Sequence, residues 1–290
     1  MHLLNLGEII AMREKLILRV SSKRVFDPYI KRYPRFKEKW LTFDSALTKG
    51  IEGYLDEVEF KKFLEYLRAK LDYQFSFIRR EYKESEIISA RLLTMSITPT
   101  FEPTGEQLGT EYQDKCTICR AGRIVTGDLI LDLTKVPRVA DMAKTIARDE
   151  WVVSERMGSL IEDNKVRGCE LKPVRHHKNR KLKKMWYQLT VNSTVKISGK
   201  TRYGDAFRHN MKIESIKSPC GHTINMFPFS EVYIKKNSWD GSDIVKTDLY
   251  FGGQLNLIYP APEVLISQRF YRLLREKNIK GFRIEIAHLV

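Results

Sequence analysis

The chain has 290 residues, of which 42% are hydrophobic and 30% charged, a composition typical of a globular protein and not of a disordered one. No apolar run is long enough to span a bilayer, and Glu8 interrupts the N-terminal apolar stretch before any small-residue cleavage site. We therefore expect a cytoplasmic protein without a membrane segment. Its formal charge of +15, from 51 Lys and Arg against 36 Asp and Glu, favours acidic partners or polyanions.

The start of the chain is basic. Residues 13–39 contain ten Lys or Arg against three acids. Within this segment, residues 15–20 suit a short strand, whereas the aromatic side chains near Pro28 and Pro34 suit an irregular segment. Met12 stands directly before the predicted strand, so the sequence is compatible with a natural start at either methionine, the first or the twelfth.

The strongest helical signal follows at about 54–73, where apolar side chains recur at helical spacing. They are Phe60, Phe63, Leu64, Leu67 and Leu71. Residues 85–101 are rich in apolar side chains and favour a strand or an extended crossover, and the turn-forming residues at 102–106 indicate a linker. The organisation expected from these signals is a helix-containing basic N-terminal region at 1–105 and a second domain at 106–290.

An internal near-repeat occupies the second domain. Residues 152–171 match residues 265–284, with identical Ser, Arg, Leu and Gly at aligned positions. In each copy the serine can cap a helix, the apolar residues can form its buried stripe, and the glycine follows where the chain must reverse. Each copy is therefore predicted to fold as a strand, a helix and a strand, within modules spanning about 112–175 and 216–288.

Further strands are predicted between and after the repeated segments. The alternating stretches are Trp186–Val191, Thr194–Ile197 and Val232–Ile234. The predicted fold class is therefore α+β, with mainly antiparallel sheet and a duplicated strand-helix-strand module.

Two pairs of side chains could bind a metal ion. Cys116 and Cys119 have the two-residue gap that lets both thiolates reach one tetrahedral ion, and Cys220 and His222 offer a thiolate and an imidazole. Each pair lies upstream of one repeated unit, so a duplicated module would contribute two ligands from each copy to one structural zinc ion. The alternatives are ordinary buried thiols with an unrelated histidine, or a redox role of Cys116 and Cys119.

A second basic segment lies between residues 172 and 184, which contain seven Lys or Arg, two His and no acid. Such a segment could grip phosphates, with an aromatic ring available for stacking. The residues concerned are Lys178, Arg180, Lys181, Lys183, Lys184 and Trp186. We favour a solvated loop between strands ending at Val174 and beginning near Trp186, because no predicted helix places these side chains in a groove.

Residues 153–156 (VSER) and 168–174 (GCELKPV), with Cys116-x-x-Cys119 ahead of them, resemble bacterial polymorphic-toxin immunity proteins of the double-CxxCG type. The resemblance covers residues 112–175, extends more weakly to the second copy, and leaves the first 105 residues unexplained. Arg120 stands where the family has a glycine, and Cys-Gly-His replaces its second CxxCG. The resemblance implies a non-enzymatic, zinc-stabilised protein that binds and neutralises a toxin.

The charge of the chain restricts the partner. Immunity proteins to nucleases commonly mimic the acidic substrate, whereas this chain is basic, so a toxin partner should present an acidic surface. The same charge supports a second hypothesis, a zinc-ribbon-like nucleic-acid-binding or defence-associated protein that uses residues 13–39 and 172–184. An enzyme has the least support, because the sequence contains neither His-Glu-x-x-His nor Gly-x-Ser-x-Gly.

Overall fold

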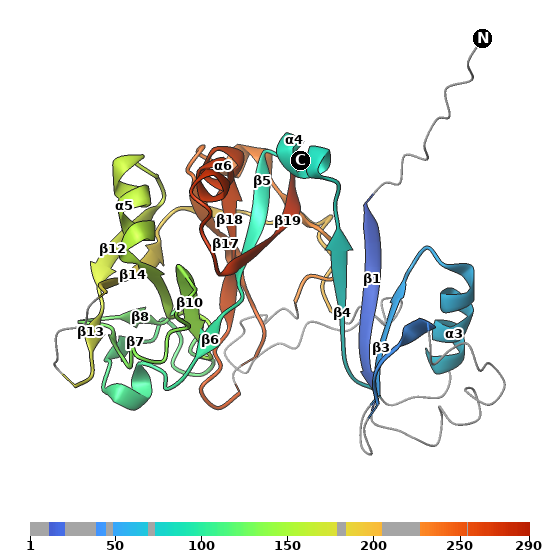
Figure 1. Ribbon diagram of the computed structural model, residues 1–290, viewed down its shortest axis with the longest axis horizontal. Helices are drawn as coiled ribbons and strands as arrows, with labels where there is room; N and C mark the ends of the chain where they lie inside the picture. Colours follow the sequence, from blue (N-terminus) through green and yellow to red (C-terminus); the bar gives the residue numbers. More distant parts are fainter. Residues whose placement is uncertain are drawn as a thin grey trace, which may run out of the picture. The chain divides into compact units, whose positions relative to one another are not determined.

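The computed structural model in Figure 1 describes residues 12–20, 39–44, 49–68, 73–178, 184–204, 227–253 and 255–290. Along most of the chain, the first of two compact units ends at Ile87 and the second begins at Ile88. The boundary thus precedes the predicted linker at 102–106, because β5 (Leu92–Ile97) pairs within a sheet of the second unit. None of the helices in the described part of the chain is long and apolar enough to cross a membrane.

The first unit contains an antiparallel sheet with the strand order β2-β3-β1-β4, and its described residues include the helix α3 (Val58–Arg68). Its strands are β1 (Arg13–Val20), β2 (Leu41–Asp44), β3 (Lys49–Tyr54) and β4 (Tyr73–Glu81). The predicted strand at 15–20 is confirmed as part of β1. The predicted helix is confirmed but shorter than 54–73, since Leu55 and Asp56 form a turn before it. Its apolar stripe packs against Trp40, whose ring stacks on that of Phe63 with centroids 6.0 Å apart.

The short helix α4 (Glu84–Ser89) opens the segment for which extended structure was predicted, and β5 follows it. The second unit contains two larger sheets. The five-stranded sheet has the order β12 (Cys169–Pro173), β14 (Trp186–Val191), β11 (Trp151–Ser154), β10 (Met142–Thr145) and β6 (Thr100–Phe101). The six-stranded sheet has the order β15 (Thr194–Val195), β17 (Ile244–Phe251), β18 (Ala261–Ser267), β5, β19 (Phe282–Leu289) and β16 (Val232–Ile234).

Smaller elements complete the second unit. The helices are α5 (Glu155–Asp163), α6 (Gln268–Glu276) and the short η1 (Glu106–Leu108) and η2 (Lys236–Ser238). Two-stranded ladders join β7 (Tyr112–Gln113) to β8 (Ile124–Val125), and β9 (Ile130–Leu131) to β13 (Arg175–His176). The α+β class with mainly antiparallel pairing is therefore confirmed.

The predicted strand-helix-strand unit is present twice. We call β10, β11, α5 and β12 the first copy, and β17, β18, α6 and β19 the second copy. Ser154 and Ser267 cap the two helices, accepting hydrogen bonds from the backbone N–H groups of Met157 and Phe270. Figure 1 shows α5 beside the sheet of the first copy and α6 beside that of the second.

The two copies exchange a strand. β5 precedes the first copy in the chain but pairs with β18 and β19 of the second, whereas β14 follows the first copy and pairs with its β11 and β12. The registers correspond as well, since Ser154 lies opposite Trp186 and Ser267 lies opposite Leu92. The duplication thus extends upstream of the segments that the sequence aligned.

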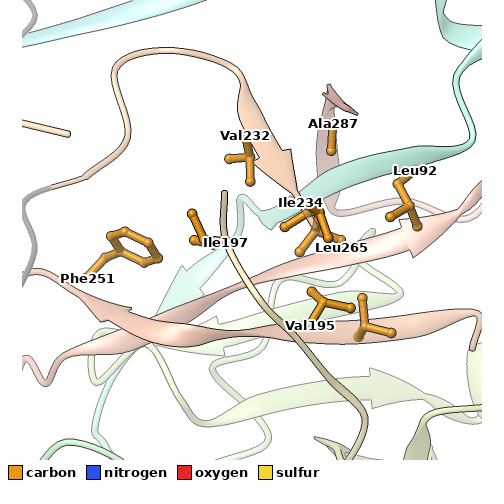
Figure 2. Packing of buried hydrophobic residues seen from close by; sticks show 9 residues of the cluster. Leu92, Val195, Ile197, Val232, Ile234, Phe251, Leu265 and Ala287 are labelled. Atoms are coloured by element: carbon orange, nitrogen blue, oxygen red, sulfur yellow. The ribbon is translucent and has the colours of Figure 1, made fainter. Parts of the chain in front are cut away.

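The cores of the two sheets correspond too. The core cluster of the six-stranded sheet includes Leu92, Val195, Val245 and Leu265, and Figure 2 labels Leu92, Val195 and Leu265 within it. Residues in the same register positions form the core of the five-stranded sheet, namely Trp186, Phe101, Ala143 and Val152. Large and small side chains have changed places between the copies, so that each core is filled differently on the same backbone plan.

One carboxylate in each copy links that copy to the other through hydrogen bonds, and we call this arrangement the lock. Asp141 accepts hydrogen bonds from Ser154 Oγ at 3.0 Å and Arg156 Nε at 3.0 Å, and from the backbone N of Lys280 in the second copy at 2.9 Å. The equivalent Asp243 accepts hydrogen bonds from Ser267 Oγ at 2.8 Å and Arg269 Nη1 at 2.6 Å, both in the second copy. It also accepts one from Arg167 N in the first copy at 3.1 Å. The repeated Ser and Arg therefore have a structural role.

This lock predicts a pH dependence. Burial raises the pKa of Asp141, but hydrogen bonds from Arg156, Lys280 N and Ser154 outweigh burial and lower the pKa below its ordinary value. Ionised Asp141 therefore stabilises the fold above about pH 4, and this stabilisation is lost as the pH falls through the lowered folded-state pKa. We expect Asp141→Asn to cost about 1–3 kcal/mol at pH 7, and urea unfolding should show this cost shrinking towards pH 3. A cost independent of pH would contradict the assignment.

Candidate metal centre

The Cys116-x-x-Cys119 segment forms a tight turn in the loop between β7 and β8. The backbone N–H of Arg120 donates to the carbonyl oxygen of Cys116 at 2.9 Å, closing the turn. Both cysteines are thiols and are buried, with exposed fractions of 7% and 3%. Because β7 and β8 pair antiparallel, the turn lies on a hairpin, which is the setting of a metal-binding knuckle.

Arg120 has the backbone conformation that glycine favours, with φ at +55°. It occupies the position at which the immunity-protein family has a glycine. Its side chain donates to Asp114 at 2.8 Å, to Glu106 at 2.9 Å and to the hydroxyl of Tyr259 at 2.8 Å. These contacts offset the cost of placing a side chain in the left-handed region.

The turn packs against the second copy. Cys116, Cys119 and Ala121 form a small apolar cluster against which Tyr250 of β17 is packed. Gly122, with φ at +73°, approaches the same ring so closely that a Cβ atom would lie 2.7 Å from its hydroxyl oxygen. Two thiol donors are thus held side by side in a water-poor turn, which fits one half of a tetrahedral zinc site.

A buried charge network lies beside the turn. Arg123 and Glu150 each have a side chain only 1% exposed, and their nearest nitrogen and oxygen are 2.9 Å apart. Arg123 also donates to Asp149 at 2.5 Å and to Glu106 at 3.2 Å, while the hydroxyl of Tyr112 donates to Glu150 at 2.5 Å. Burial and the charge of Glu150 raise the pKa of Tyr112. The sequence offered no signal for this network, because its members come from separate loops and strands.

The other predicted ligands, Cys220 and His222, lie outside the described residues. The candidate nucleic-acid residues Arg180, Lys181 and Lys183 lie outside them as well.

Lys178 and Lys184 are exposed. Trp186, however, is only 7% exposed and belongs to the core of the five-stranded sheet. Its indole is therefore not available to stack on a base, because β14 turns it towards Val152 and Phe101. Within the described residues, Lys178 follows β13 and Lys184 precedes β14.

A second group of possible ligands was missed by the sequence reading. Asp132, His176 and His177 place one ligand atom each within 4.8 Å of the others. Nδ1 of His176 lies 3.2 Å from the carbonyl oxygen of Leu131, and the two imidazole rings meet edge to face at 4.6 Å. The parallel pairing of β9 with β13 brings these side chains together, and their spacing in the sequence does not indicate it.

The described surroundings of the cysteines thus fit a structural metal site and leave its second half to residues beyond the described ranges. Comparison with known protein families finds no matching family, and comparison with curated proteins finds no match either.

Proposed function

We propose that the chain is a non-enzymatic bacterial binding protein of the immunity-protein kind, which neutralises a toxin and is stabilised by a structural zinc ion. The observation that carries the proposal is the left-handed Arg120 after Cys119. A positive φ at this position is what the glycine of a CxxCG knuckle would favour, and this supports the proposal. The proposed ligands are Cys116, Cys119, Cys220 and His222, and four protein ligands would leave the ion a folding role.

The proposed partner is a protein with an acidic surface. A net charge of +15 would speed association with such a partner and would slow association with a basic one. The family resemblance supports a toxin as this partner, since proteins of that type act by binding.

Zinc content tests the proposal. We expect one zinc ion per chain in the purified parent protein, and loss of zinc with a lower thermal midpoint in Cys116→Ser and in His222→Ala, because removal of one ligand opens a structural site. Cys169→Ser is the matched control. Cys169 lies half-buried on β12, where burial and Asp243 raise its pKa to about 12, so its thiol is not a ready metal ligand. A parent protein that is stable without metal would contradict the proposal.

The runner-up function is nucleic-acid binding by the exposed lysines of the loop at 172–184. Fluorescence anisotropy with a single-stranded oligonucleotide separates the two functions. Contacts to phosphates release counterions, so nucleic-acid binding should weaken steeply and log-linearly with salt. Tight binding that follows this law and is lost when Lys178 and Lys184 are both replaced by alanine would favour the runner-up.

A further inference from the structure

A cavity of about 190 Å³ lies between the two copies. It is beside the turn at residues 116–119, which we call the zinc turn after the proposed ion. Its lining is both cationic and apolar. The cations are Lys115, Arg123, Arg148, Lys172 and Lys246, and the apolar walls include Trp151, Val191, Tyr250, Pro260 and Val264. Lys115 directly precedes Cys116, and Tyr250 packs against both cysteines, so the zinc turn forms part of the wall.

The cavity carries positive charge that the described residues do not neutralise. Asp149, its one acidic lining residue within the described ranges, is held by Arg123 through contacts of 2.5 and 2.8 Å. Lys115 and Lys246 make no ion pair with a described carboxylate. Burial and the nearby Lys115 lower the pKa of Lys246, as expected of an amine that lacks a counterion.

The duplication supplies an internal comparison for this lysine. Lys144 holds the equivalent position in the first copy, since it pairs with Trp151 as Lys246 pairs with Val264. Burial and the charge of Arg148 lower the pKa of Lys144 as well, but the charge of Glu263 opposes them. The carboxylate equivalent to Glu263 is Glu150.

The carboxylate of Glu150 already accepts hydrogen bonds from other side chains. It accepts hydrogen bonds from Arg123, Tyr112 and Thr145 at 2.9, 2.5 and 2.5 Å. The symmetry of the two copies is therefore broken at this point. Lys246 keeps the charge of its counterpart and lacks the carboxylate that its counterpart has.

We infer that this cavity binds a carboxylate side chain, presented by an acidic peptide segment of a protein partner. The inference rests on the proposed function, whose partner it describes more closely. Pockets for drug-sized ligands measure roughly 300–1,000 Å³, so 190 Å³ suits one or two side chains better than a nucleotide. The apolar walls suit aliphatic residues flanking the acid, and the amines of Lys115 and Lys246 supply charge-assisted hydrogen bonds.

The test uses the full-length chain and a fluorescein-labelled six-residue peptide of alternating Glu and Leu, with binding followed by anisotropy. Lys246→Gln and Lys115→Gln should each weaken binding about tenfold, the effect of losing one charge-assisted contact. Lys144→Gln is the matched control, because it removes the same charge from the equivalent position outside the cavity. It should change the affinity less than about twofold, since only the distant field is altered.

Equal weakening by Lys144→Gln and Lys246→Gln would overturn the inference, because net charge alone would then explain binding. Absence of peptide binding by the folded parent would overturn it too. An oligothymidylate of equal charge that binds more tightly than the peptide, and loses affinity with Lys246→Gln, would assign the cavity to phosphate instead. Zinc measured in the same samples separates the two proposals: zinc-loaded parent protein that ignores the peptide refutes the cavity alone, and metal-free stable protein refutes the proposed function.

Discussion

Replacing Gly281 by alanine should destabilise the second unit by about 2–6 kcal/mol. Gly281 has φ at +109°, and a Cβ atom there would lie 2.2 Å from the carbonyl oxygen of Met142. A strained backbone costs about 1–3 kcal/mol and overpacking a similar amount. Because Met142 belongs to β10 of the other copy, the close approach joins the copies and has no flexible side chain that could move aside.

Chemical unfolding followed by tryptophan fluorescence measures this effect. Gly168→Ala should behave in the same way, since its Cβ atom would lie 2.0 Å from the carbonyl oxygen of Ile244. Gly127→Ala is the control, because nothing lies within 4 Å of its Cβ position. If Gly281→Ala unfolded at the same denaturant concentration as the control, the interlocked arrangement of the copies would be wrong.

Glu150→Ala should cost about 3–5 kcal/mol, the usual effect of breaking a buried ion pair by removing one partner. The substitution leaves the guanidinium of Arg123 buried with less compensation and removes the acceptor of Gly105 N, Thr145 Oγ and Tyr112 Oη. The urea midpoint is the measurement. The network adjoins the zinc turn through Glu106 and Arg120, so the variant should also release zinc more readily to a chelator.

Glu170→Ala is the comparison for that loss. Glu170 forms a salt bridge of 3.6 Å with Lys172, and both side chains are about half exposed. Removing an exposed pair of this kind costs less than about 1 kcal/mol. Equal losses in Glu150→Ala and Glu170→Ala would show that the buried network contributes no special stability.

Local patterns predicted the elements of the second unit well. The serine caps, the glycine reversals and the strands at 186–191 and 232–234 all depend on neighbouring residues, and the structure confirms them. The repeated helices each bury an apolar stripe, which includes Met157, Leu160 and Ile161 in the first copy and Phe270, Tyr271 and Leu274 in the second.

The strand exchange could not be predicted in this way. The offset between equivalent residues grows along the chain, from Leu92 and Trp186 to Met142 and Ile244 and then to Ser154 and Ser267. Loops of different length therefore hide the duplication from any alignment at one offset, and the earlier segments retain only scattered identities such as Asp141 with Asp243 and Lys144 with Lys246. The compact units meet at Ile87 and Ile88, upstream of the predicted linker, since β5 belongs to a sheet whose other strands lie far along the chain.

The structure also separates two sources of the family resemblance. Ser154 and Arg156 bind Asp141, and Gly168 approaches β17, so these matching positions maintain the fold and say little about a partner. The cysteine turn is different, because Cys116 and Cys119 are the positions at which we propose a metal ion. The functional content of the resemblance therefore depends on the metal site.

X-ray absorption at the zinc edge of the purified full-length chain tests that site most directly. We expect three sulfur ligands at about 2.3 Å and one nitrogen ligand at about 2.0 Å, from the three cysteines and one histidine proposed. A first shell of nitrogen and oxygen alone would contradict it and would assign the ion to a group such as Asp132, His176 and His177.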